Sequence, residues 1–255
     1  MSYHGRFVWY ELMTTDTAGA KAFYPKVTGW TTQAWEGPME YSMWVNAGTP
    51  MGGLMTLPEE AKAMGAPPCW QGNIGTTDLA ATVAKATELG GRLLSGPQTI
   101  PTVGSFAVIA DPQGAVFTAF QPAGNAPGRE GRPKAGEIAW HELYSSDAAA
   151  ALEFYKALFG WESAGSMDMG PMGTYHMFGR GGVPMGGAMN RPPQVPVSMW
   201  QYYIHTDDIA KAVDAATANG ATVLAGIMDV PGGGKIANLR DPQGAVFALH
   251  QGAPE

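Results

Sequence analysis

The sequence has little of what several classes of protein depend on. With one cysteine, Cys69, it forms no internal disulfide and no metal site built from several cysteines, which favours a reducing compartment. No run approaches the roughly 20 apolar residues of a membrane span, and the first residues lack the apolar segment of a signal peptide. We therefore expect a cytoplasmic protein that does not enter a membrane.

Basic residues are also scarce, since 15 Lys and Arg stand against 22 Asp and Glu, for a net charge of −7. Apart from a short stretch at residues 129–134, the sequence lacks the clustered positive charge that binds phosphate backbones. We expect no nucleic-acid partner and a small molecule as the ligand. A hydrophobic content of 45% with 15% charged residues is typical of a folded globular chain.

A heptapeptide that occurs twice organises the chain. Asp-Pro-Gln-Gly-Ala-Val-Phe at residues 111–117 returns at residues 241–247, which is 130 residues later. Asp and Pro at the first two positions favour a type I turn, and the apolar residues that follow predict a strand. The chain therefore consists of two copies of one unit.

Each copy contains the same smaller pattern twice. A run of strand-forming residues leads to an aspartate at a helix N-cap position, then to apolar residues at helical spacing and further short strands. The four cap residues are Asp16, Asp78, Asp147 and Asp208. The pattern predicts four βαβββ modules, paired into one domain over residues 5–122 and a second over residues 137–252. Residues 123–136, rich in Gly and Pro, are the expected linker.

With these modules in place, the chain resembles the vicinal oxygen chelate superfamily, which includes glyoxalase I, bleomycin-binding proteins and extradiol dioxygenases. It is most similar to the tandem-domain, glyoxalase-like proteins of bacteria. The resemblance covers nearly all of residues 7–251 and rests on the cap aspartates, the Phe-Tyr helices that end in Gly-Trp, and the Asp-Pro-Gln-Gly turns. It implies an α+β fold of two glyoxalase-like domains, each with a curved mixed sheet that forms a cup. The superfamily hosts lyases, isomerases, oxygenases and binders, so the fold alone does not assign a function.

In this family, metal ligands point into the cup from fixed strand positions. Carried onto this sequence, those positions are Trp9, Gln71, Thr118, Trp140, Gln201 and Ala248. Tryptophan and alanine bind no metal, and glutamine is a weak ligand beside His or Glu. We therefore expect no metal at these positions and no tightly held cofactor.

Residues two apart on a strand share a face, which extends the prediction to the rest of each cup. The predicted ligand-binding residues are Trp9, Glu11, Gln71, Asn73, Trp140, Tyr144, Gln201 and Tyr203. The predicted catalytic residues are Glu142, His205 and His250. A carboxylate beside Trp in an apolar cup has its charged form disfavoured, so the pKa of Glu11 or Glu142 would rise toward the range of a general acid or base. The alternative is that each carboxylate only accepts hydrogen bonds from neighbouring strands.

The leading hypothesis is a glyoxalase-like protein that binds a small apolar or aromatic metabolite in aromatic, Met-lined cups without the usual metal centre. If chemistry occurs, Glu142 would be the base and the two histidines its proton-donating partners. One alternative is a metal-dependent lyase, isomerase or dioxygenase whose displaced site uses Glu142, His205 and His250. A second alternative is a regulatory or interaction module. The identity of the ligand and the choice between monomer and homodimer stay open.

Overall fold

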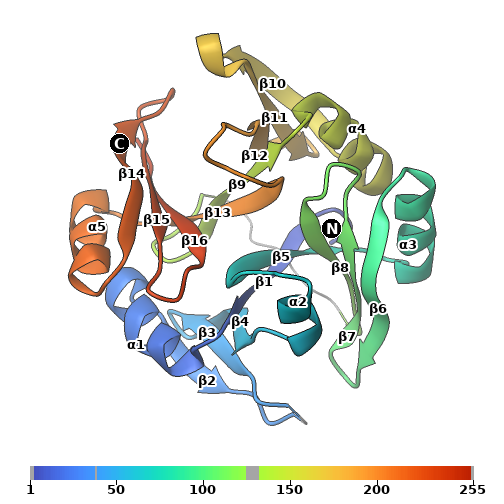
Figure 1. Ribbon diagram of the computed structural model, residues 1–255, viewed down its shortest axis with the longest axis horizontal. Coiled ribbons are helices and arrows are strands. Elements are labelled where there is room, and N and C mark those ends of the chain that lie inside the picture. The colour runs from blue at the N-terminus through green and yellow to red at the C-terminus, as the bar shows by residue number, and fades with distance from the viewer. Residues whose placement is uncertain (1–2, 38, 125–131, 254–255) are drawn as a thin grey trace. The chain divides into compact units, whose positions relative to one another are not determined.

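The computed structural model describes residues 3–37, 39–124 and 132–253 and contains two eight-stranded mixed sheets (Figure 1). The first sheet has the strand order β2-β3-β4-β1-β5-β8-β7-β6, and the second has the order β10-β11-β12-β9-β13-β16-β15-β14. The two orders are equivalent, which confirms the predicted duplication and the α+β fold of four βαβββ modules.

The elements of the first half are β1 (Phe7–Thr14), α1 (Thr17–Thr28), β2 (Thr31–Ala34), β3 (Ser42–Asn46), β4 (Thr49–Thr56), α2 (Glu59–Ala63), β5 (Cys69–Gly75), α3 (Leu79–Glu88), β6 (Arg92–Ile100), β7 (Gly104–Ala110) and β8 (Val116–Pro122). Those of the second half are β9 (Ile138–Ser145), α4 (Ala148–Phe159), β10 (Glu162–Asp168), the 3-10 helix η1 (Gly170–Met172), β11 (Thr174–Arg180), β12 (Val183–Asn190), β13 (Met199–His205), α5 (Ile209–Ala218), β14 (Thr222–Asp229), β15 (Lys235–Arg240) and β16 (Val246–Gln251). The first module spans β1 to β4, the second β5 to β8, the third β9 to β12 and the fourth β13 to β16.

Each module closes by pairing its first strand with its last. The parallel pairs are β1 with β4, β5 with β8, β9 with β12 and β13 with β16. The second, third and fourth strands of each module pair antiparallel and are joined by short connections. The first strand of each module therefore lies in the middle of its sheet, and these four strands carry most of the predicted site residues.

The four helices that follow the cap aspartates begin where the sequence predicts, whereas the short helix α2 lies in a segment that the sequence predicts as a loop. The side chain of Asp16 accepts a hydrogen bond from the backbone of Gly19, and Asp78, Asp147 and Asp208 cap their helices in the same way. The two Phe-Tyr helices, α1 and α4, end at Gly29 and Gly160 with φ of 76° and 69°. This left-handed conformation favours glycine and explains the Gly-Trp sequence after both helices.

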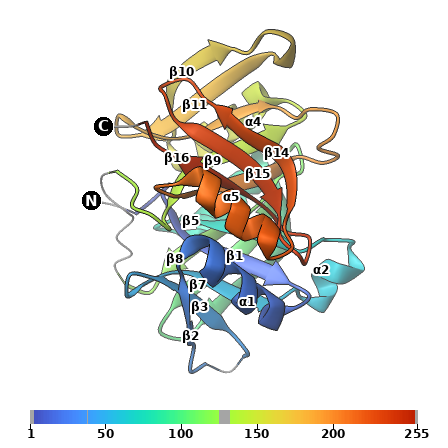
Figure 2. The ribbon, with the colours of Figure 1, turned by 90° about the vertical axis from the view of Figure 1, so that its left-hand side faces the viewer.

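By contacts, the chain divides into two compact units, and each combines modules from both halves. The outer-module unit holds the first and fourth modules, with residues 9–70, 131–139 and 201–255. The inner-module unit holds the second and third, with residues 1–8, 71–130 and 140–200. Within the outer-module unit α1 lies beside α5 (Figures 1 and 2), and within the inner-module unit α3 lies beside α4 (Figure 1).

A buried chain of hydrogen bonds fixes the repeated turn in each unit. In the outer-module unit, Trp70 Nε1 donates to the Tyr24 hydroxyl over 2.8 Å, and that hydroxyl donates to Asp241 Oδ2 over 2.9 Å. The inner-module unit repeats the chain at 3.0 and 3.1 Å with Trp200, Tyr155 and Asp111. A helix of one half therefore binds the turn of the other half.

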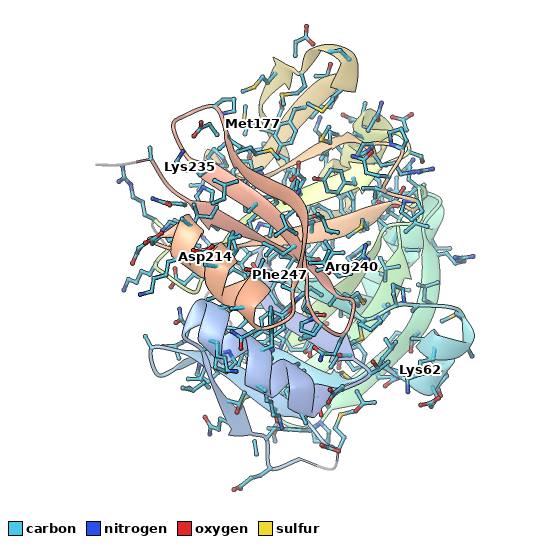
Figure 3. All side chains as sticks on the ribbon, turned by 60° about the vertical axis from the view of Figure 1, so that its left-hand side comes forward. Lys62, Met177, Asp214, Lys235, Arg240 and Phe247 are labelled. Atoms are coloured by element: carbon cyan, nitrogen blue, oxygen red, sulfur yellow. The ribbon has the colours of Figure 1, made fainter. Side chains whose placement is uncertain are left out.

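Asp241 also closes its own turn, because Oδ1 accepts from the backbone of Gln243 and Ala245 over 3.0 and 2.8 Å. Phe247, the last residue of the heptapeptide and labelled on β16 in Figure 3, packs edge-on against Phe23 and Tyr24 of α1. The heptapeptide is thus a structural turn that joins the halves.

The segments before the first and third modules are bound in equivalent ways. The backbone oxygen of Gly5 accepts from Trp161 Nε1 over 2.7 Å, and that of Gly136 accepts from Trp30 Nε1 over 2.8 Å. Gly136 belongs to the predicted linker, whose residues 125–131 lie outside the described part of the chain. Among the described helices, none is long and apolar enough to cross a membrane.

Candidate functional site

The first module carries a cluster of three polar and aromatic side chains. Trp9 and Glu11 lie on the same face of β1, and Tyr41, just before β3, reaches both. Trp9 Nε1 donates to the Tyr41 hydroxyl over 2.8 Å, and this hydroxyl donates to Glu11 Oε1 over 2.9 Å. We name these residues the first triad. Its hydrogen bonds run in one direction and end on a carboxyl group.

The two oxygens of the Glu11 carboxyl group have different surroundings. Oε1 accepts from Tyr41, whereas Oε2 is buried and has no hydrogen-bond partner among the described residues. Burial raises the pKa of Glu11 from 4.5 to about 7, against the lowering effect of the hydrogen bonds from Tyr41 and Trp9. Both protonation states are therefore populated near neutral pH, which suits a general acid or base. The direction of this shift is the one that the sequence analysis expects, and the role of Glu11 as an acid or base stays a prediction.

A glycine makes room for the triad. Gly53 pairs with Glu11 across β1 and β4, and a Cβ at this position would collide with the Tyr41 hydroxyl and with Glu11 Oε2. Because β4 lies between β3 and β1, the missing side chain lets Tyr41 reach across β4 to the carboxyl group.

The third module repeats this arrangement as the second triad, Trp140, Tyr175 and Glu142. Trp140 Nε1 donates to the Tyr175 hydroxyl over 2.7 Å. Burial, followed by the charge of Glu142, raises the pKa of Tyr175. Glu142 is 6% exposed and has an interaction partner. Gly187 pairs with Glu142 and leaves the space that the Tyr175 ring fills, as Gly53 does for Tyr41.

In the second module, amide side chains occupy the corresponding face. Gln71 on β5 donates through Nε2 to Thr118 Oγ1 on β8. Asn73, the strand partner of Thr118, is 7% exposed, and its Oδ1 is buried with no partner in the described residues. A buried unsatisfied acceptor costs free energy, which a ligand O–H or N–H group would relieve.

In the fourth module, Gln201 Nε2 donates to Asn238 Oδ1 over 2.8 Å, and Tyr203 is buried. At the carboxyl end of β13, His205 Nδ1 lies 3.2 Å from Nδ1 of His250 on β16. Burial, followed by the charge of His205, lowers the pKa of His250 to about 4. The two histidines predicted to be catalytic are therefore adjacent.

The structure gathers the predicted site residues into local groups. Trp9 joins Glu11, Gln71 joins Asn73, Trp140 joins Glu142 and Tyr144, and Gln201 and Tyr203 precede the histidine pair on β13. Glu142 belongs to the inner-module unit, whereas His205 and His250 belong to the outer-module unit.

Sequence reasoning missed Tyr41 and Tyr175, which complete the two triads. A signal for them exists, because each tyrosine stands 12 residues before the glycine that makes room for it, Gly53 or Gly187. A tyrosine 12 residues before a glycine thus occurs at the same place in both halves of the chain.

The side chains at the family's metal-ligand positions do not fit a metal centre. Trp9 and Trp140 donate their indole N–H groups to tyrosines, Gln71 is bonded to Thr118, and Ala248 has no donor atom. In residues 3–37, 39–124 and 132–253, no group of three or more His, Cys, Asp or Glu side chains is placed to hold a metal ion.

Two family models match the chain. The model described as the Glyoxalase/Bleomycin resistance protein/Dioxygenase superfamily matches residues 137–249, and the model described as a Glyoxalase-like domain matches residues 9–120. Each half is thus similar to the same kind of domain.

Relatives and solved structures agree with this result. The chain is 33% identical to CFP32 of Mycobacterium tuberculosis, a glyoxylase by name, over 97% of this chain and 95% of the relative. It is 27% identical to the anthracycline biosynthesis protein DnrV of Streptomyces peucetius, over 98% and 95% of the two chains. The fold is similar to the Mn(II)-bound glyoxalase from Novosphingobium aromaticivorans, with a TM-score of 0.63 at 16% identity, covering 99% of this chain and 83% of that one.

Proposed function

Because the chain belongs to the glyoxalase/bleomycin resistance protein/dioxygenase superfamily, we propose that it binds a small apolar or aromatic metabolite against its triads and that Glu11 exchanges a proton with this ligand. The observation that carries the proposal is the environment of the Glu11 carboxyl group. Tyr41 donates a hydrogen bond to it, and burial raises its pKa to about 7. A buried carboxyl oxygen without a hydrogen-bond partner, as at Glu11 Oε2, lowers the stability of the fold. A glutamate that is kept in such a position favours a role in chemistry.

The ligand surface of the first triad is aromatic and apolar around one acid. Trp9 is partly exposed, and Met13 and Met55 are strand partners on the face that also carries Glu11. An indole ring stacks on aromatic ligands, and methionine adapts to their outline. The similarity to the anthracycline biosynthesis protein DnrV supports an aromatic ligand, because anthracyclines are built from fused rings.

Tyr41 is the contact through which the proton travels. Its hydroxyl oxygen accepts from Trp9 and donates its proton to Glu11 Oε1. When a ligand proton passes to this oxygen, the tyrosine proton passes to Glu11, and Tyr41 stays uncharged. Burial, followed by the charge of Glu11, raises the pKa of Tyr41 and disfavours a tyrosinate, so the two transfers occur together. The reverse step returns the proton to the ligand.

The test is a combined binding and exchange assay in the presence of EDTA. A panel of hydroxylated aromatics and cyclic diketones is screened by quenching of tryptophan fluorescence, and ligands that bind are followed by NMR for exchange of a C–H proton with D₂O. We expect Glu11→Gln to bind the same ligands but to exchange at least about 100-fold more slowly.

The matched control is Glu36→Gln, which changes an exposed carboxylate on the same module and should leave the exchange rate unchanged. Native exchange in Glu11→Gln, or complete loss of exchange with EDTA in the native protein, would show that the proposed proton transfer is wrong. Binding without any exchange would leave a binding protein and remove the catalytic part of the proposal.

A further inference from the structure

Two histidines on neighbouring parallel strands of the outer-module unit form a contact that the proposed function does not use. His205 ends β13, His250 lies on β16, and the two are strand partners. Their Nδ1 atoms lie 3.2 Å apart, and the ring planes are tilted by 41°. When both rings are neutral, this contact is a hydrogen bond if one ring carries its proton on Nδ1 and the other carries its proton on Nε2.

The spacing of the two nitrogens also suits a shared cation. Two Zn–N bonds of about 2.0–2.1 Å at a tetrahedral angle place their nitrogens roughly 3.4 Å apart. The observed separation of 3.2 Å is close to that value, so small rotations of the rings would direct both lone pairs to one ion. Imidazole nitrogen is a preferred ligand of zinc, copper and nickel.

The backbone around the pair is fixed at three places. The His205 N–H donates to the Glu137 oxygen, and the His205 oxygen accepts from the Gly136 N–H, both over 2.8 Å. The His250 oxygen accepts from the Thr206 N–H over 2.8 Å. Ligands held in place before an ion arrives lose less conformational entropy when they bind it.

The rings have a carboxylate nearby and glycines beside them. Asp207 Oδ1 lies 3.9 Å from His205 Nε2, which is beyond hydrogen-bond distance but places a negative charge near the pair. Gly234 lies next to His250 and Gly252 next to His205, so neither position places a side chain over the rings.

We propose that His205 and His250 together bind one divalent transition cation, Zn(II), Cu(II) or Ni(II), through their Nδ1 atoms, with water as the remaining ligands. These residues are not the family's ligand positions on the same strands, which are Gln201 and Ala248. The equivalent strand pair in the first half is Gly75 and Phe120, so we expect one ion per chain.

The test is isothermal titration of the full-length, tag-free, metal-stripped protein with ZnCl₂ and, separately, NiCl₂. We expect one ion per chain, with affinity reduced at least about tenfold in His205→Ala and in His250→Ala. Asp207→Asn should weaken binding by less than about tenfold, because it removes only an exposed negative charge near the pair. His176→Ala is the matched control, since His176 is a partly exposed histidine on β11, and it should bind as the native protein does.

A second measurement separates ligation from a loss of structure. In NMR spectra, Zn(II) should shift the Cε1–H signals of two histidines, and these should be the signals that vanish in His205→Gln and His250→Gln. Circular dichroism verifies that each variant is folded. Native affinity in both single variants, an equal loss in His176→Ala, or no binding by the native protein up to about 1 mM metal would each overturn the proposal.

Discussion

The first and second triads have the same strand positions, the same Trp-to-Tyr hydrogen bond and the same glycine beside the tyrosine, yet their carboxyl groups differ. Glu11 is partly exposed, whereas Glu142 is 6% exposed. Tyr41 donates to Glu11 over 2.9 Å, and in the second triad burial, followed by the charge of Glu142, raises the pKa of Tyr175. A duplicated scaffold thus keeps the triad geometry while the exposure of its glutamate changes.

We propose that this difference makes the first triad the one that exchanges a proton with a ligand. A carboxyl group with a pKa of about 7 can both take and give a proton at neutral pH, and Glu11 is partly exposed. In the second triad, Trp140 donates to Tyr175 beside the more deeply buried Glu142. Three comparisons of matched variants test the assignment.

The largest effect is expected in the pH dependence of stability. Because burial raises the pKa of Glu11 to about 7, above its ordinary value of 4.5, the folded protein holds a proton that the unfolded chain releases. This contribution to stability is fully present below pH 4.5 and is lost as the pH rises through 7. It amounts to roughly 3 kcal/mol, so Glu11→Gln should flatten the curve of unfolding free energy against pH over this range.

Urea unfolding at several pH values measures this effect. Burial raises the pKa of Asp111 and Asp241 as well, and comparing the variant with the native protein removes their common contribution. Glu142→Gln is the matched comparison in the second triad. A curve for Glu11→Gln that parallels the native curve would contradict the raised pKa.

The next effect concerns the glycines beside the tyrosines. Gly53→Ala places a methyl group against the Tyr41 hydroxyl and Glu11 Oε2, and Gly187→Ala places one against the Tyr175 ring. Each should destabilise the protein by about 1–3 kcal/mol, because the tyrosine must move. Only Gly53→Ala should also slow the proton exchange assigned to Glu11. Equal exchange in the two variants would remove the functional distinction between the triads.

The smallest effect is expected from removing one hydroxyl group. Tyr41→Phe should cost about 1 kcal/mol and should raise the pKa of Glu11 above its native value, because the Tyr41 hydrogen bond lowers that pKa. The carboxyl ¹³C chemical shift of labelled glutamate measures the titration. Tyr175→Phe is the control and should leave the Glu11 titration unchanged. A Glu11 pKa that falls in Tyr41→Phe would be inconsistent with the hydrogen bond as described.

Much of the fold could be predicted from the sequence because its signals are local and repeated. Aspartate caps, glycine stops and the doubled heptapeptide gave four modules in the right order, and strand alternation placed Trp9 and Glu11 on one face. Alternation also placed Glu11 beside Trp9, but the rise in its pKa comes from burial, and the hydrogen bond from Trp9 acts against it.

The rest depends on contacts between residues that no local pattern joins. Tyr41 reaches Glu11 only because Gly53, on the strand between them, has no side chain. The partner of Asp241 is Tyr24, 217 residues away in the sequence. Tyr24 belongs to one of the Phe-Tyr helices, and Asp241 opens the repeated heptapeptide. Neither pattern predicts their hydrogen bond, which forms only because the fold brings the first and fourth modules together.

The exchange of tyrosines between the halves has a consequence for how such a chain arises. Residues 1–124 alone would contain Tyr24 without Asp241, but they would also contain Asp111, which has the same place in its own turn. Two identical copies of this half would satisfy each other, with the tyrosine of each bound to the aspartate of its twin. The chain therefore has the form of a homodimer whose subunits became covalently joined. Once joined, the two copies were free to differ, and the strand ends that carry Gly75 and Phe120 in the first half carry His205 and His250 in the second.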